Sequence, residues 1–135
     1  MSDSSNLAIE AVSGVTICKV RGPLKLGYPA LDELRRFCCE LRSRDISRLV
    51  LDLEHVPSID SSGLGVLLHA YTSLRNLGGQ CKLLNVARTP AEVLRVVGLL
   101  SVFEVYQDRN ALLTSFDRHP EQTKTALTRD PERAA

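Results

Sequence analysis

The run Leu49–Leu53 restricts the fold more than any other feature, because apolar side chains stand at almost every position of it. A strand with one solvated face alternates apolar and polar residues, whereas a strand covered on both faces is apolar nearly throughout. The run is also short and continuous, as buried strands are. We therefore predict a central strand here, covered on both faces of its sheet.

The residues before this run predict a hairpin followed by a helix. Leu7–Val12 and Val15–Val20 are strand-like, and Ser13-Gly14 between them is a turn signal. A helix is expected from Pro29 to about Arg44, because proline suits the first helical turn and apolar residues then recur at helical spacing.

The residues after the run predict three helices that alternate with two strands. The first helix should be capped by Asp60 or Ser61 and end near Leu77, before Gly78-Gly79. The further elements are a strand at Gln80–Val86, a helix with a capping box at Thr89–Glu92, a strand at Val102–Tyr106 and a helix capped by Asp108. The expected buried stripes are Leu64, Leu67, Leu68, Tyr71 and Leu74 in the first helix, and Val93, Val96, Val97 and Leu100 in the second.

This order, β-β-α-β-α-β-α-β-α, predicts an α/β fold with a mixed sheet of about five strands and about four helices packed on it. A length of 135 residues suits one compact domain. We assign residues 7–117 to that domain and residues 1–6 to a flexible N-terminus. Residues 118–135 lose the periodic pattern, and we expect a disordered tail there.

Charge and hydropathy exclude several classes of function. A formal net charge of +1 leaves no basic footprint for nucleic acid or for an anionic membrane surface. No apolar run is long enough to cross a bilayer, and residues 1–6 lack the basic and apolar regions of a signal peptide. We therefore expect a cytoplasmic protein that contacts neither nucleic acid nor membrane directly.

The cysteines and histidines suggest neither a redox centre nor a metal site. No C-x-x-C pair occurs, and we expect Cys18, Cys38 and Cys81 to be buried as small apolar residues, with Cys39 more exposed. Asp52, His55 and Asp60 lack the spacing of a metal-ligand set. We expect no metal and no cofactor.

The segment Asp60-Ser61-Ser62-Gly63-Leu64-Gly65 is the unusual part of the sequence. Helix capping explains Asp60 and Ser61, since short oxygen-bearing side chains satisfy the free N–H groups of a helix start. Capping does not explain two glycines, each of which costs a helix interior about 1 kcal/mol relative to alanine. Either the helix packs closely on its neighbours, or a bare backbone admits a partner.

The stretch from Leu51 to Gly65 resembles the central motif of STAS domains, specifically those of bacterial anti-sigma factor antagonists. The similarity spans about residues 7–117 and continues in Tyr71, Arg75, Gly78-Gly79, Lys82–Asn85 and Leu99–Val105. The resemblance implies a single STAS domain whose helices pack mainly on one side of the mixed sheet.

The resemblance also implies a mechanism, partner switching, and no enzymatic activity. The unmodified protein would bind an anti-sigma factor that is also a serine kinase and so free a sigma factor. The kinase would then phosphorylate Ser62, with Ser61 as the alternative acceptor, and a serine phosphatase would reset the protein. The implied partner-binding residues are Asp60, Ser61, Ser62, Gly63, Leu64 and Gly65, to which we add Lys25.

Lys25 departs from the family pattern. Many members carry acidic residues in the loop after the second strand, whereas this chain has Gly22–Gly27 with Lys25 inside it. The lysine can pair with a phosphoserine or with an acidic partner surface, or it can be a solvated loop residue.

Two other functions compete with this interpretation. A STAS-like chain can also serve as a stressosome component or as a small subunit bound to the ATPase of an ABC transporter. A small serine hydrolase or phosphatase would use Ser62 as the nucleophile and would require a nearby base, for which His55 is the best placed histidine.

Overall fold

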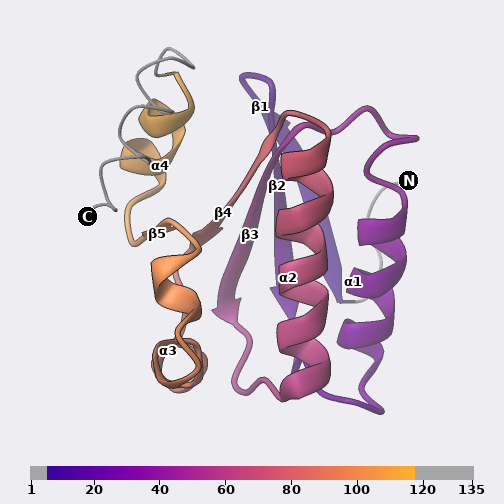
Figure 1. Cartoon of the computed structure of the whole chain (residues 1–135), viewed down its shortest axis with the longest axis vertical. Coiled ribbons are helices and arrows are strands. Elements are labelled where there is room, and N and C mark those ends of the chain that lie inside the picture. The colour runs from indigo at the N-terminus through magenta and orange to yellow at the C-terminus, as the bar shows by residue number, and fades with distance from the viewer. Residues whose placement is uncertain (1–5, 118–135) are drawn as a thin grey trace.

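The apolar run lies at the centre of the sheet, as predicted. The computed structural model describes residues 6–117; residues 1–5 and the predicted tail at 118–135 lie outside the described residues. The five strands are ordered β1-β2-β3-β4-β5 (Figure 1). Their bounds are β1 Leu7–Val12, β2 Val15–Arg21, β3 Arg48–His55, β4 Gln80–Leu84 and β5 Val105–Tyr106. Only β1 and β2 pair in antiparallel fashion, so the sheet is mixed.

Helices cover both faces of the sheet, but unequally. α1 (Pro29–Cys39) and α2 (Ser61–Asn76) lie side by side over one face, and α4 (Arg109–Phe116) packs on the other (Figure 1). α3 (Arg88–Val96) and the short 3-10 helix η1 (Leu99–Ser101) complete the described part of the chain. This arrangement confirms the predicted α/β class with helices mainly on one side.

The side chains of β3 show why its sequence is apolar throughout. Leu49, Leu51 and Leu53 enter the large core beneath α1 and α2. Val50 belongs to the smaller cluster that also contains Leu112 of α4. Successive side chains of a strand point to opposite faces, so a strand between two cores needs apolar residues on both.

α1 is shorter than predicted, because it ends at Cys39 rather than near Arg44. Glu40 leaves the helical conformation (φ −104°, ψ 4°), and its N–H donates to the carbonyl oxygen of Phe37. Turns then follow, with Asp45 in the left-handed region at φ 58°. These turns direct the chain toward β3.

The buried face of α2 is rotated relative to the predicted stripe. Leu67 and Leu74 are buried as expected, but Leu68 is exposed, and Leu64 and Tyr71 are only partly buried. The remaining buried positions belong to small or medium side chains, namely Gly63, Val66 and Ala70. Small side chains allow a helix to approach its neighbours closely. The buried face of α2 therefore includes small residues and could not be predicted from the large apolar residues alone.

α3 begins earlier than the predicted capping box. The carbonyl oxygen of Ala87 accepts from the N–H of Ala91 at 2.9 Å, and Ala87 is the N-cap residue. Thr89 therefore lies inside the helix and caps nothing. Pro90 occupies the third helical position, where an N–H group would have no intrahelical partner either.

The predicted buried face of α3 is wrong except at Val93, which is half-buried and packs against the core. Pro90 and Leu94 are its buried residues, while Val96 and Val97 are 70% and 51% exposed. Leu100, in η1, is also exposed. The predicted strand at 102–106 is reduced to the two residues of β5, because η1 and the turn after it occupy the preceding residues.

Candidate functional site

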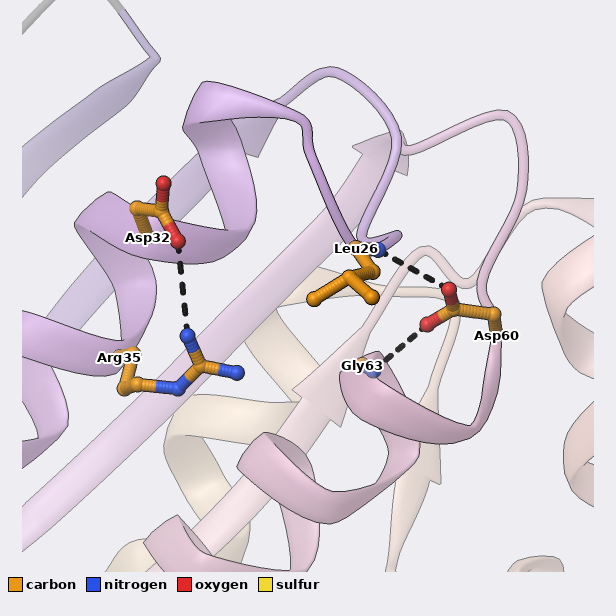
Figure 2. A network of polar contacts seen from close by, with 5 residues as sticks. All are labelled: Leu26, Asp32, Arg35, Asp60 and Gly63. Carbon is orange, nitrogen blue, oxygen red and sulfur yellow. Dashed lines mark hydrogen bonds and ion pairs between the residues drawn. The ribbon is translucent and has the colours of Figure 1, made fainter.

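Asp60 joins the start of α2 to the loop between β2 and α1. One carboxylate oxygen, Oδ1, accepts from the Gly63 N–H at 3.0 Å, as an N-cap does. The other, Oδ2, accepts from the Leu26 N–H at 2.9 Å (Figure 2). These hydrogen bonds, with the one from Leu26 contributing most, lower the pKa of Asp60. The residue is a helix cap, as predicted, and also a link across 34 positions of sequence.

The loop after β2 runs beside the segment that leads into α2. Leu24 forms an isolated parallel bridge with Ile59. Its N–H donates to the carbonyl oxygen of Ser58 at 3.0 Å, and its own carbonyl oxygen accepts from the Asp60 N–H at 3.2 Å. The strand-like pairing therefore places Lys25 and Leu26 next to the first turn of α2.

The two glycines of the motif have different surroundings. A Cβ atom on Gly63 would lie 2.2 Å from the Leu24 carbonyl oxygen and 2.7 Å from Cγ1 of Ile59. A Cβ atom on Gly65 would have nothing within 4 Å. Gly63 is thus explained by close packing against the loop, and only Gly65 leaves open space beside the helix.

The two serines lie in the first turn of α2. Ser61 is exposed and Ser62 is half-buried. Ser61 is not a helix cap, contrary to one of the predicted alternatives, because Asp60 holds that position. Within residues 6–117 no hydrogen bond engages either hydroxyl group.

Sequence reasoning missed two exposed apolar residues of the same loop. Leu26 is 71% exposed, and Tyr28 is also exposed. Lys25 lies between Leu24 and Leu26, and its charge contributes to the lowered pKa of Asp60. Leu26 and Tyr28 belong to no helical or strand periodicity in the sequence, so only their exposure in the structure distinguishes them.

Neither His55 nor His69, the histidines among residues 6–117, is hydrogen-bonded to Ser62. His55 is exposed, and its Nε2 lies 3.8 Å from Glu54 Oε1. His69 Nε2 lies 3.5 Å from Ser73 Oγ, and His119 lies outside the described residues. No group of three or more His, Cys, Asp or Glu residues within 6–117 is placed to hold a metal ion.

Fold and site together define a mixed-sheet α/β domain in which one aspartate ties a strand-following loop to the start of a helix. The chain belongs to the STAS domain family, whose model matches residues 6–112. The anti-sigma F factor antagonist of Paenibacillus polymyxa is 30% identical over 115 residues, which are 83% of this chain and 97% of that protein.

Solved structures show the same fold. An anti-sigma factor antagonist from Mycobacterium paratuberculosis superposes with a TM-score of 0.74 at 21% identity, covering 87% of this chain and 98% of that one. The Bacillus cell fate determinant SpoIIAA in its phosphorylated form gives a TM-score of 0.64 at 20% identity, covering 82% and 98%. None of the helices in the described part of our chain is long and apolar enough to cross a membrane.

Proposed function

We propose that this protein is an anti-sigma factor antagonist that works by partner switching. Unphosphorylated, it binds an anti-sigma factor that is also a serine kinase; phosphorylated at Ser62, it dissociates, and a serine phosphatase restores it. The antagonist from Paenibacillus polymyxa supports this role, since it matches nearly over its full length. The role is regulatory rather than enzymatic and places the protein in the cytoplasm.

The observation that carries the proposal is the junction of the β2–α1 loop with the start of α2. Asp60 holds Leu26, a largely exposed apolar residue, next to the turn that contains Ser61 and Ser62. Contiguous exposed apolar groups beside polar ones are typical of protein-binding surfaces. We propose that Asp60 to Gly65, Lys25 and the two missed residues, Leu26 and Tyr28, form this docking surface.

Phosphorylation at this position can switch binding without unfolding the domain. A phosphate adds about −1.5 to −2 charges at pH 7. The first turn of a helix tolerates an anion, because its free N–H groups favour negative charge by about 0.3–1 kcal/mol. The same charge inside a docked apolar interface is costly to desolvate. The half-buried position of Ser62 would place it at the edge of that interface.

The test measures binding of the purified full chain to its cognate anti-sigma factor kinase by isothermal titration calorimetry. We expect Ser62→Asp to weaken binding at least tenfold and Ser62→Ala to bind normally and resist phosphorylation. Ser47→Asp is the matched control, because Ser47 is exposed and lies near Gly79, beyond the other end of α2. Equal affinity of Ser62→Asp and Ser47→Asp would refute the switch.

Three further assays on the same purified protein separate the competing functions. Mass spectrometry after incubation with kinase and ATP should find phosphate on Ser62, or on Ser61 if the alternative acceptor is used. Stable capture of a transporter ATPase instead of a kinase would favour the transporter-subunit role. Ester or phosphoester turnover that His55→Ala abolishes would favour the hydrolase.

A further inference from the structure

The edge of the sheet next to β5 is open along the first part of β4. β5 pairs with Leu83 and Leu84 only. Gln80–Lys82 pair with β3 on their inner side and have no strand on their outer side within the described residues. An uncovered strand edge presents N–H and C=O groups that can pair with another extended chain.

The backbone of Cys81 points to this open side. Gln80 donates its N–H toward β3, to the carbonyl oxygen of Ser47 at 2.8 Å, whereas Leu83 donates away from β3, to Glu104 at 3.0 Å. Backbone groups of successive residues point to opposite edges of a strand, so Cys81 has the direction of Leu83. No residue between 6 and 117 hydrogen-bonds to its N–H or C=O.

A groove lies over the same edge. The cavity has a volume of about 560 Å³ and is bounded by the second half of α2, the start of β4 and the residues that follow η1. Leu68, Tyr71 and Val102 contribute apolar surface to this groove.

We infer that this groove binds an extended peptide segment of a partner protein, which adds to the outer edge of β4 as a further strand. The peptide backbone pairs with the N–H and C=O groups of Cys81 at the outer edge of β4. Alternate peptide side chains face the apolar wall formed by Leu68 and Val102. This binding mode requires an extended peptide backbone, and it accounts for both the open edge of β4 and the groove beside it.

Charge specifies the peptide further. Arg75 lines the groove, is exposed, and donates to the Tyr71 hydroxyl at 3.5 Å, but has no carboxylate partner within residues 6–117. A peptide with alternating apolar residues and an acidic residue near Arg75 matches this lining. Arg75 is 13 positions from Ser62 along α2, about 20 Å at 1.5 Å per residue. The groove is thus separate from the proposed switch surface.

A phage-displayed random dodecapeptide library, panned against the full chain, tests the inference. We expect enriched peptides in which apolar residues alternate and an acid is present. Their affinity, measured by fluorescence polarisation, should fall at least tenfold for Arg75→Glu and for Val102→Asp. Arg36→Glu, on the exposed side of α1, is the matched charge reversal and should bind as the wild type does.

Amide hydrogen exchange locates the contact independently of the variants. Addition of an enriched peptide should slow exchange of the Cys81 N–H at least tenfold, while the Leu83 N–H, already bonded to Glu104, changes little. The same peptide N-methylated at alternate residues should not bind. Absence of enrichment, equal binding to Arg75→Glu, or protection confined to Leu26 and Ser62 would each overturn the inference.

Discussion

Gly63 and Gly65 stand two positions apart in α2, yet the space beside them differs completely. Gly63 faces the Leu24 carbonyl oxygen at a distance that excludes a side chain, and Gly65 faces open space. One glycine is therefore a requirement of packing. Gly65 is unfavourable for the helix, and no neighbouring atom requires a glycine there. A glycine at this position is consistent with a surface that a partner approaches closely.

Alanine substitutions should separate these two roles. We expect Gly63→Ala to lower the free energy of unfolding by about 1–3 kcal/mol, because the loop must move away from the helix. Gly65→Ala should instead raise it by up to about 1 kcal/mol, because alanine favours the helix and meets no atom. Urea denaturation monitored by circular dichroism measures both. Equal effects of the two substitutions would show that the loop does not pack as described.

Asp60 should make stability depend on pH in the acid range. Its hydrogen bonds lower its pKa below the ordinary value of 3.8 in the folded state. The resulting stabilisation is fully present above pH 3.8 and is lost as pH falls through the lower folded pKa. Asp60→Asn retains a good N-cap but loses the charge.

We therefore expect Asp60→Asn to unfold at lower urea concentration than wild type at pH 7. The difference between the two proteins should shrink as the pH falls below 3.8 and through the lower folded pKa of Asp60, because the carboxylate then gains a proton and loses its charge. Urea titrations at pH 7, 4 and 2 provide the measurement. A difference that stays constant with pH would mean that the carboxylate charge does not stabilise the fold.

At the scale of elements, α4 is attached to the sheet by a buried lysine. Lys82 Nζ donates to Ser115 Oγ at 2.7 Å, lies 3.1 Å from Glu104 Oε1 and lies 4.4 Å from the centre of the Phe116 ring. Ser115 also donates to the carbonyl oxygen of Leu112. The charged group of Lys82 therefore lies between the sheet and α4, on the face of the sheet that α1 and α2 do not cover.

We expect the size of the Lys82 side chain to matter more than its charge. Lys82→Ala should cost at least about 2 kcal/mol, because it leaves a cavity beneath α4. The free energy of unfolding of Lys82→Met should stay within about 1.5 kcal/mol of the wild-type value, because the methionine side chain fills the same space. Neither former partner of the lysine is left without an alternative, since Glu104 is partly solvated and Ser115 still donates to the carbonyl oxygen of Leu112. Urea denaturation compares the two. Equal destabilisation would show that the charged hydrogen bonds dominate.

At the scale of the whole molecule, the thiols report on the core. Cys18, Cys38 and Cys81 are free and buried, as predicted, whereas Cys39 is exposed. Burial raises the pKa of Cys18 and of Cys38 to about 12 and raises that of Cys81 as well. Only the thiolate reacts, so these three thiols are protected both by burial and by protonation.

Ellman's reagent at pH 8 should therefore modify one thiol in the native protein and all four in urea. The native reaction should disappear in Cys39→Ser, while that variant still shows three thiols when unfolded. The rate at which the buried thiols become reactive reports opening of the core. Fast native reaction of more than one thiol would contradict the burial of Cys18, Cys38 and Cys81 in the core.

Features that depend on neighbouring residues could be predicted from the sequence alone. The apolar run of β3, the proline that starts α1, the cap at Asp60 and the glycines after α2 identify strands, helix starts and one helix end through local hydrogen bonds and backbone preferences. The family motif in Asp60 to Gly65 added the expected role of this region.

Which surfaces pack against one another became clear only from the three-dimensional fold. It showed that small residues face the core in α2, that Val96 at the end of α3 and Val97 after it do not, and that η1 shortens β5 and leaves the edge of β4 open. It also brought Leu26 to Asp60 across 34 positions of sequence. Such contacts depend on how elements fit against one another in space, and local hydrophobic periodicity does not contain that information.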